Sequence, residues 1–248
     1  MMVEKIESFG ITDIGPVRTN NEDVWSQILS IPFFVLTDGM GGHQAGEVAA
    51  KVAVIKLCQQ IDALFATQSE FTIPTLEAEL KRSIEEMSAF VYELSEENED
   101  LKGMGTTVCT LLLHRGSAVY GHVGDSRIYR FRKGILSQLT HDHSLRSQLL
   151  AKGKLDDTAA QAFPLKNVIT RAIGTSPKVE AEVGSCPVEA EDIYFLCSDG
   201  LTDVVSHKEL EKIIIKTPNV AEACHLLVET AKKNGGTDNI TVVMIKVL

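Results

Sequence analysis

Four apolar segments of this 248-residue chain begin or end at an aspartate that stands beside a small turn-forming residue. These aspartates are Asp38, Asp125, Asp199 and Asp238. One such aspartate is most often only a turn former, because Asp-Gly is a common hairpin signal. Four of them constrain the fold more strongly, since strands of a sheet bring their ends to a common edge. Carboxylates that meet there repel one another unless cations lie between them, so the pattern predicts a metal site.

Length and composition fit one large domain, which we expect to span residues 1–248. The net charge of −10, without clustered Lys and Arg, argues against a nucleic-acid partner. The N-terminus lacks an apolar leader and no segment approaches the length of a membrane span, so we expect a cytoplasmic protein with no membrane partner. The five cysteines include no Cys-x-x-Cys, which predicts buried free thiols rather than disulfides or a zinc ribbon.

Hydrophobic periodicity predicts strands grouped in runs and helices grouped in pairs. The predicted strands are 8–14, 24–31, 33–38, four short strands within 106–139, then 179–183, 193–198 and 240–247. The predicted helices are 45–65, 76–94, 207–216 and 220–234. Because the four central strands recur roughly every 8–12 residues, they favour an antiparallel meander. The predicted fold is α+β, a four-layer α-β-β-α sandwich of two antiparallel sheets flanked by helix pairs.

The segment from residue 143 to residue 174 shows no clear periodicity except a helical stretch around 145–152. Long mixed connections of this kind are often functional, so we expect a flap here. The acidic run 93–100 is expected to be a solvated turn after the second helix. His141 and His143 form the only close histidine pair, but two ligands are too few for zinc and we expect a solvated loop.

Carboxylates and carbonyls are hard oxygen ligands that suit Mg²⁺ or Mn²⁺. Two such ions about 3.5–4 Å apart activate a water between them and neutralise a phosphoryl group. The chemistry that follows is hydrolysis of a phosphate ester. Arg18, in a polar loop between two predicted strands, could hold phosphate oxygens in a bidentate fork, although such an arginine is more often part of a surface ion pair.

Seven short motifs follow one another along the chain. They are Arg18-x-x-Asn21-Glu22-Asp23, Asp38-Gly39-Met40-Gly41-Gly42-His43, Gly105-Thr106-Thr107, Gly124-Asp125-Ser126-Arg127, Asp142-His143, Ser198-Asp199-Gly200 and Asp238-Asn239. Together they resemble the ordered motif set of the metal-dependent serine/threonine protein phosphatases, the type 2C class or PPM family, in its bacterial form. The match runs from about residue 8 to the C-terminus. Each motif alone is weak, but seven in the family order are very specific.

The resemblance implies a set of metal ligands. Asp38 would bridge two Mn²⁺ or Mg²⁺ ions, with the carbonyl oxygen of Gly39 on the second ion. Asp199 and Asp238 would complete the shell of the first ion. Bacterial members often bind a third, weaker ion, for which the matching residues are Asp125 and Asp199.

The resemblance also implies three catalytic residues. Arg18 would hold the substrate phosphate, and Asp23 would orient a metal-bound water. Animal-type members carry a histidine directly after the first Asp-Gly, where it is thought to protonate the leaving alcohol, but Met40 stands there in this chain. His43 and a metal-bound water are therefore alternative proton donors. Asp142 is a further candidate at the site, with a turn or cap as the alternative.

The expected activity is hydrolysis of phosphoserine and phosphothreonine by a metal-bridging hydroxide, without a covalent intermediate. The expected partners are phosphorylated proteins, including a serine/threonine kinase or its substrates, and we expect a monomer. One alternative is a dedicated phosphatase of a regulatory partner-switching protein. A non-catalytic phosphopeptide-binding module is disfavoured because all the metal aspartates are present. A metal-dependent nuclease or phosphodiesterase fits poorly with the acidic composition.

Overall fold

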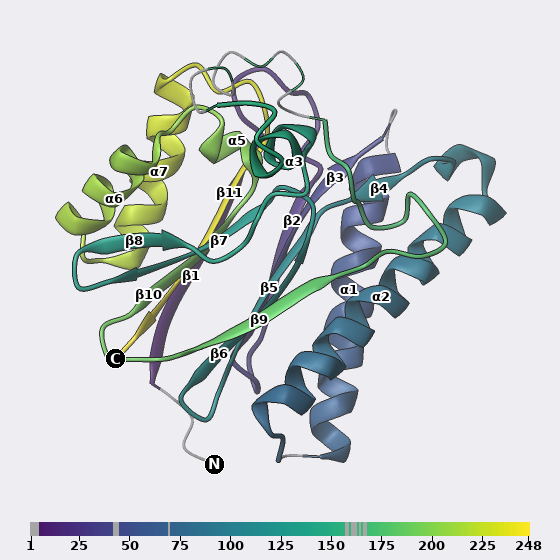
Figure 1. Ribbon diagram of the computed structural model, residues 1–248, viewed down its shortest axis with the longest axis horizontal. Coiled ribbons are helices and arrows are strands. Elements are labelled where there is room, and N and C mark those ends of the chain that lie inside the picture. The colour runs from purple at the N-terminus through teal and green to yellow at the C-terminus, as the bar shows by residue number, and fades with distance from the viewer. Residues whose placement is uncertain are drawn as a thin grey trace.

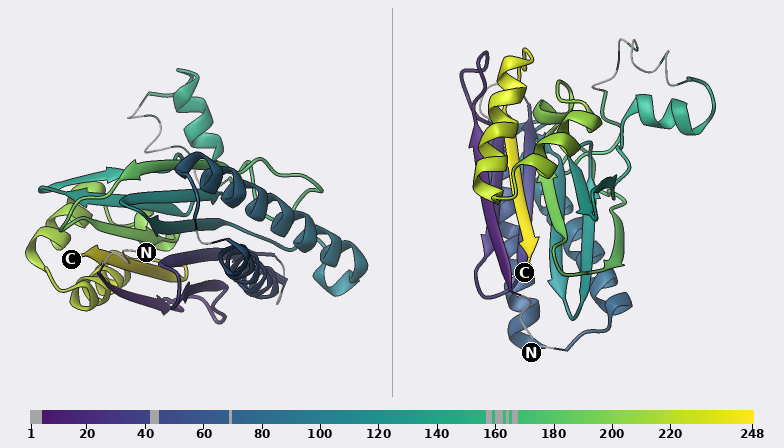
Figure 2. Two further views of the ribbon diagram at one scale, coloured as in Figure 1. Left: turned by 90° about the horizontal axis from the view of Figure 1, so that it is seen from below. Right: turned by 90° about the vertical axis from the view of Figure 1, so that its left-hand side faces the viewer.

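A computed structural model describes residues 5–41, 45–68, 70–156, 159, 163, 165 and 168–248. Two antiparallel sheets lie face to face, and helices cover the outer face of each sheet (Figures 1 and 2). The predicted α+β sandwich is therefore confirmed. The start of the strand Ile6–Asp13 and the C-terminus lie at one end of the molecule, and the loops that follow this strand and the helix Val220–Lys233 lie at the opposite end (Figure 1).

The first sheet has the strand order β2-β3-β5-β6-β9, with the short β4 paired to β3. Its strands are β2 (Asp23–Ile28), β3 (Phe33–Met40), β4 (Gly105–Thr106), β5 (Val108–His114), β6 (Ser117–Val123) and β9 (Glu182–Pro187). Two long helices, α1 (Ala45–Thr67) and α2 (Ile73–Glu97), pack on its outer face. The buried stripe of α2 includes Leu76, Leu80 and Ile84, all fully buried against this sheet.

The second sheet has the strand order β1-β11-β10-β7-β8. Its strands are β1 (Ile6–Asp13), β7 (Arg127–Arg132), β8 (Ile135–Gln138), β10 (Ile193–Cys197) and β11 (Ile240–Val247). The helices α5 (Asp199–Thr202), α6 (His207–Lys216) and α7 (Val220–Lys233) cover it. A third apolar cluster, which includes Phe34, Tyr194 and Val243, fills the space between the two sheets.

Helix boundaries follow from local capping. Thr72 accepts a hydrogen bond from the backbone N–H of Thr75 at the start of α2, where Pro74 occupies the first turn. Ser206 and Asn219 cap α6 and α7 in the same way. These caps place the two C-terminal helices within one residue of their predicted bounds. No helix among the described residues is long and apolar enough to cross a membrane.

The predicted meander between residues 106 and 139 is wrong. β5 and β6 pair in the first sheet, whereas β7 and β8 pair in the second, so the chain changes sheets after Val123. The turn begins at Gly124, whose φ of 110° lies in a region that favours glycine. Alternation of apolar residues predicts strands but does not say which strands pair. The change of sheets between β6 and β7 brings Asp125 to the edge shared by both sheets.

Smaller differences occur near other element ends. The strand predicted at 179–183 lies at Glu182–Pro187, and the predicted acidic turn is helical as far as Glu97, with a short 3₁₀ helix, η1 (Glu99–Leu101), after it. The predicted free thiols are confirmed, although two of the five cysteines are only half-buried.

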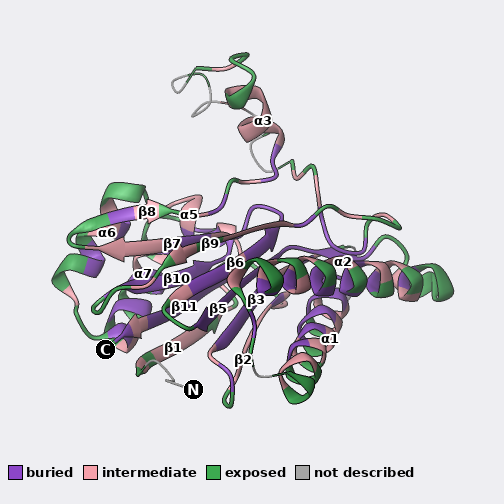
Figure 3. Cartoon of the chain, turned by 60° about the horizontal axis from the view of Figure 1, so that its bottom comes forward, coloured by how far each residue is buried: buried purple, intermediate pink, exposed green. Residues whose placement is uncertain are grey.

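The segment predicted as a flap contains α3 (Leu145–Ala151), which projects from the body of the molecule (Figure 2). Its base is closed by antiparallel bridges between Ser144 and Ile169 and between Thr106 and Ile173. Burial differs between the sandwich and the flap. The central strands are largely buried, whereas the residues of α3 are half-buried or exposed (Figure 3). The part of this segment from 157 to 167 is outside the described residues except for three single positions.

Candidate metal centre

The predicted aspartates come from five different elements at one end of the sandwich. Asp23 begins β2 and pairs in register with Asp38 of β3. Asp38 is not at a strand end as expected, because β3 continues to Met40. Asp199 opens the short helix α5 directly after β10, and no hairpin turn forms there.

Electrostatic coupling shows that the carboxylates converge. Burial raises the pKa of Asp38 well above its usual range, and the charges of Asp23, Asp199, Asp125 and Asp238 raise it further. One carboxyl group therefore experiences the charges of four others. The structure thus brings together all four aspartates of the sequence pattern, with Asp23 as a fifth.

Three other carboxyl groups near Asp38 also have raised pKa values. Burial raises the pKa of Asp23 to about 7, with further contributions from Asp199 and Asp238. Burial and the charge of Asp199 raise the pKa of Asp125 to about 7. Burial raises the pKa of Asp199 itself to about 6. Such shifts are typical of carboxylates that lack an opposite charge.

Two carboxylate oxygens of the cluster are buried without a hydrogen-bond partner among the described residues, Asp23 Oδ1 and Asp125 Oδ1. The other oxygen of Asp23 is well satisfied, because Ser198 Oγ and Thr241 Oγ1 donate to Oδ2 at 2.8 and 2.7 Å. Buried polar atoms without partners are rare and call for an explanation. A divalent cation that prefers oxygen ligands supplies one, so the donor set fits Mn²⁺ or Mg²⁺.

Threonine hydroxyls hold the backbone of Asp38. Its N–H donates to Thr107 Oγ1 at 3.0 Å, its carbonyl accepts from the Thr107 N–H at 2.8 Å, and Thr107 Oγ1 lies 2.7 Å from Ser126 Oγ. Thr107 thus joins β3 to the crossover that carries Asp125. The next residue, Gly39, is closely packed, because a Cβ there would lie 2.3 Å from the carbonyl oxygen of Gly46. Only glycine fits this backbone.

Arg18 forms an ion pair with one of the clustered aspartates. Its Nη2 lies 2.7 Å from Asp238 Oδ2, and both side chains are partly exposed. The ion-pair alternative raised by the sequence is therefore what the structure contains, but the partner is itself a candidate metal ligand. This contact places the guanidinium beside the cluster, on a partly exposed side of it.

Asn239 fixes the loop that carries Arg18, a role that sequence reasoning missed. Its Nδ2 donates to the carbonyl oxygens of Ile14 and Asn20 at 2.9 Å, and its Oδ1 accepts from the Glu22 N–H at 2.9 Å. One buried amide thus holds both ends of the loop. The sequence signal was present in the motif Asp238-Asn239, but the distant partners were not visible in it.

Two other predicted residues have different outcomes. Asp142 receives a bidentate contact from Arg127, with Nε and Nη2 at 2.8 and 2.6 Å from its two oxygens. It is therefore neither a simple turn former nor an unpaired carboxylate. His43 lies outside the described residues, so its role as a proton donor stays a prediction.

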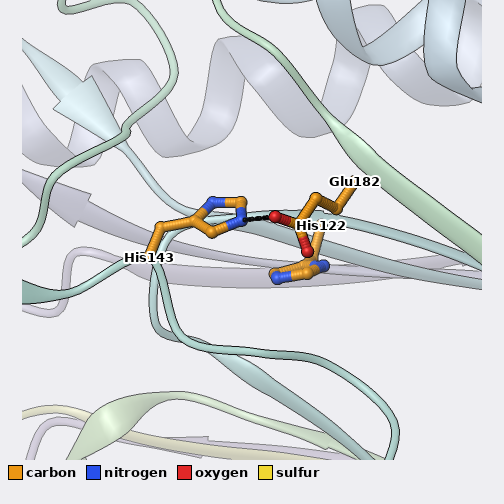
Figure 4. Close-up of side chains that lie close together, drawn as sticks. All are labelled: His122, His143 and Glu182. Atoms are coloured by element: carbon orange, nitrogen blue, oxygen red, sulfur yellow. Dashed lines mark ion pairs between the residues drawn. The ribbon is translucent and has the colours of Figure 1, made fainter. Parts of the chain in front are cut away.

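A second cluster of metal-type side chains lies nearby, made of His122, His143 and Glu182, with ligand atoms within 4.8 Å of one another (Figure 4). His143 is buried, so the predicted solvated loop is wrong for this histidine, although His141 is exposed.

Hydrogen bonds account for the position of His143 in this cluster. The Gly124 N–H donates to His143 Nδ1 at 3.2 Å, so the proton of the neutral ring lies on Nε2, which is 3.0 Å from Glu182 Oε1. Both ring nitrogens of His143 are thereby in use, and the ring supports Gly124. His122 differs, because its Nε2 lies 2.9 Å from the His141 carbonyl oxygen but its Nδ1 is buried without a hydrogen-bond partner among the described residues.

Comparison with known proteins agrees with this geometry. Residues 18–233 match the family model described as Protein phosphatase 2C. The serine/threonine phosphatase stp of Listeria monocytogenes serotype 4b is 37% identical over 238 residues, which cover 95% of this chain and 93% of the relative. The protein phosphatase PhpP of Streptococcus pneumoniae is 36% identical over 243 residues, covering 95% of each chain.

Solved structures give the same result. The serine/threonine phosphatase PstP/Ppp of Mycobacterium tuberculosis superposes with a TM-score of 0.87 at 34% identity and 98% coverage of both chains. The catalytic domain of PstP in complex with two manganese ions gives a TM-score of 0.85 at 34% identity, again with 98% coverage of both chains. The chain therefore belongs to the protein phosphatase 2C family, the metal-dependent enzymes that hydrolyse phosphoserine and phosphothreonine in proteins.

Proposed function

We propose that this chain dephosphorylates phosphoserine and phosphothreonine at the aspartate cluster around Asp38. One observation carries the proposal, namely that Asp23 Oδ1 and Asp125 Oδ1 are buried without a hydrogen-bond partner among the described residues, beside Asp38, whose carboxyl group experiences the charges of four other carboxylates. Such a group is costly to the fold unless cations neutralise it. The family to which the chain belongs uses Mn²⁺ or Mg²⁺, which suits these oxygen donors.

The proposed ligands are those that the motifs imply. Asp38, the Gly39 carbonyl oxygen, Asp199 and Asp238 would hold two ions, with Asp38 shared between them. Asp125, together with Asp199, would hold a third ion. When bound, the ions would activate the attacking water and neutralise the phosphoryl group. The unpartnered Oδ1 of Asp125 supports this role.

Two residues act on the reactants directly. Arg18, whose Nη2 contacts Asp238 beside the cluster, would hold the phosphate oxygens through charge-assisted hydrogen bonds. Asp23 accepts a hydrogen bond from the attacking water at Oδ1, while Ser198 and Thr241 keep its Oδ2 fixed. His43, or a water held by the cations, would donate the proton to the leaving alcohol.

The physiological setting is proposed on the same basis. Residues 1–248 form one catalytic domain, with 143–174 as its flap. The enzyme is a cytoplasmic monomer that acts on phosphorylated proteins, including a serine/threonine kinase or its substrates. Profiling with several phosphoproteins distinguishes this from a dedicated phosphatase of one partner-switching regulator, which would accept a single substrate.

The direct test is release of phosphate from a phosphothreonine peptide with and without added Mn²⁺, followed by chelation. We expect activity only with the metal, and loss of activity in Asp38→Asn. Asp62→Asn is a matched control, because Asp62 is an exposed carboxylate on α1. Full activity of Asp38→Asn, or activity that survives exhaustive chelation, would overturn the proposal.

A further inference from the structure

A pocket of about 1020 Å³ lies between α3, the ends of β7 and β8 in the second sheet, and the start of β9 in the first sheet. Its walls come from the end of β7, the segment that follows β8, one side of α3 and the base of the flap. The lining residues include Arg127, Asp142, Arg146, Ser147, Arg171 and Glu182. Figure 2 shows α3 standing away from the sandwich. The side of α3 that carries Arg146 and Ser147 lines the pocket.

Three arginines line the pocket against two carboxylates, so with neutral histidines the lining carries a net charge of +1. Arg127 and Asp142 neutralise each other through their bidentate contact. Arg171 Nη1 lies 3.2 Å from Glu182 Oε1, a carboxylate that His143 shares. The chain as a whole carries a net charge of −10. The lining of the pocket is therefore positive although the chain as a whole is negative, and positive charge favours acidic ligands.

Arg146 accounts for the excess positive charge. Its Nη2 lies 3.9 Å from Asp142 Oδ2, beyond hydrogen-bonding distance, because Arg127 already occupies that carboxylate. Arg171 Nη2 is likewise 4.0 Å from Glu180 Oε2. Arg171 is engaged, because its Nη1 donates to Glu182 Oε1 and to the Glu180 carbonyl oxygen. Arg146 therefore faces the pocket with donors that Asp142 does not take up. A carboxylate supplied from outside would satisfy them with charge-assisted hydrogen bonds.

The pocket adjoins the aspartate cluster of the candidate metal centre. Arg127 stands two residues after Asp125 on the same crossover. His143, which lines the pocket, also bonds the Gly124 N–H. Asp142 adds its charge to burial and Asp199 in raising the pKa of Asp125. An extended peptide advances about 3.3 Å per residue, so residues beside a phosphorylated side chain held at the cluster would cross this pocket.

We propose that this pocket is a specificity subsite that binds an acidic side chain next to the phosphorylated residue of a protein substrate, with Arg146 as its main contact. The inference rests on the proposed function, because it concerns which phosphoproteins that site accepts. It identifies the favoured substrates as phosphoproteins with Asp or Glu close to the phosphoserine or phosphothreonine.

The test compares phosphothreonine peptides that differ only in the three residues before, or the three residues after, the phosphothreonine. Each set carries Glu, Ala or Lys at those positions, and kcat/KM is measured with saturating Mn²⁺. For the wild type we expect the Glu peptide to exceed the Lys peptide about tenfold or more on one side, the size of a charge-assisted hydrogen bond. The preference should shrink as salt concentration rises.

Two variants test the assignment to Arg146. Arg146→Glu should lower the Glu-to-Lys ratio about tenfold or more, and Arg146→Gln should lower it by less, because it removes the charge without reversing it. Lys208→Glu, at an exposed position of α6, is the control for net charge and should keep the wild-type ratio. A ratio within one sample cancels differences in the fraction of active enzyme.

The outcomes separate the two proposals. If the wild type hydrolyses the Ala peptides but shows no preference between Glu and Lys, the subsite is wrong and the proposed function stands. A preference that persists in both Arg146 variants also overturns the subsite. If no peptide and no p-nitrophenyl phosphate is hydrolysed with Mn²⁺, the proposed function itself fails.

Discussion

The two ends of strand β10 carry aspartates in opposite environments. Asp192, directly before the strand, is 1% exposed and fully paired, because Arg132 Nε, the Glu189 N–H and the Tyr194 hydroxyl donate to it at 2.7, 2.9 and 3.2 Å. Asp199, directly after the strand, lies instead among other carboxylates.

The pKa values follow from that difference. Burial acts to raise the pKa of both groups. At Asp192 the hydrogen bond and charge of Arg132 outweigh burial, so its pKa is lowered. At Asp199 the charges of Asp203 and Asp238 add to burial, and the pKa rises to about 6. A buried carboxylate with a complete set of partners stabilises the fold, whereas one that lacks them indicates a place for a ligand.

The largest effect is expected at the end of β10 where Asp199 lies among other carboxylates. Asp199→Asn should reduce Mn²⁺-dependent hydrolysis to background, because it removes a proposed ligand of the ions that activate water. The same change should leave the metal-free protein as stable as the wild type or more stable, since it removes one charge from a repulsive cluster. Activity assays and thermal unfolding without metal check the two parts. Full turnover by the variant would contradict the assignment of Asp199.

The paired end should behave in the opposite way. Asp192→Asn should lower the free energy of unfolding by about 3–5 kcal/mol, because it leaves Arg132 without its buried partner. The fraction that remains folded should keep its kcat. Glu191→Gln is a suitable control, since Glu191 belongs to an exposed pair with Lys246 and should cost less than about 1 kcal/mol. Denaturant unfolding measures both, and equal losses would erase the contrast.

A smaller effect concerns the loop beside the cluster. Arg18→Ala should mainly raise KM, with a loss in kcat/KM of about 1.5–3 kcal/mol. Asn239→Ala should raise KM in the same way, because it releases the loop that positions Arg18. Since the two residues act on one contact, the double variant should lose less than the sum.

Asn234→Ala is the matched control for Asn239, because Asn234 is an exposed asparagine that bonds the carbonyl oxygen of Val204. Kinetics with a phosphopeptide and with p-nitrophenyl phosphate provide the readout. Additive losses from Arg18→Ala and Asn239→Ala would assign Asn239 a purely structural role.

The smallest effect is the dependence of stability on pH. The folded pKa values of Asp23 and Asp125 are about 7, above the value of about 3.9 for an unfolded aspartate. Their favourable contribution is therefore complete below about pH 4 and is lost as pH rises through about 7. We expect the metal-free protein to lose on the order of 1 kcal/mol, or about 2–4 °C in Tm, for each of these two groups between pH 6 and pH 8.

Mn²⁺ should reverse this trend, because cation ligands must be deprotonated and metal binding therefore strengthens as pH rises. Thermal unfolding over this range, with and without Mn²⁺, measures both slopes. A metal-free Tm that rises from pH 6 to pH 8 would show that other groups dominate.

Much of the fold was predictable because its signals are local. α6 and the strand 240–247 have their predicted bounds, since amphipathic spacing and the Ser206 cap lie within each element. The pairing of β7 with β10 was not predictable, because alternation does not identify the neighbour of a strand. The predicted meander was wrong for this reason.

The candidate site also has parts that could be predicted from the sequence and parts that could not. The aspartates could be found from the sequence, since each is marked by a neighbouring turn residue. The Asn239 contacts and the Arg127–Asp142 pair could not, because each joins residues whose proximity depends on the folded sheets. Asp192 was missed as well, since a single aspartate before an apolar strand has many possible roles.

Calorimetric titration of the wild type with Mn²⁺ at pH 7.5, beside Asp199→Asn and Asp192→Asn, tests the central contrast most directly. We expect the wild type and Asp192→Asn to bind at least two ions per folded chain, and Asp199→Asn to lose one or bind it far more weakly. Equal stoichiometry and affinity in the wild type and Asp199→Asn would show that Asp199 has no part in holding a cation.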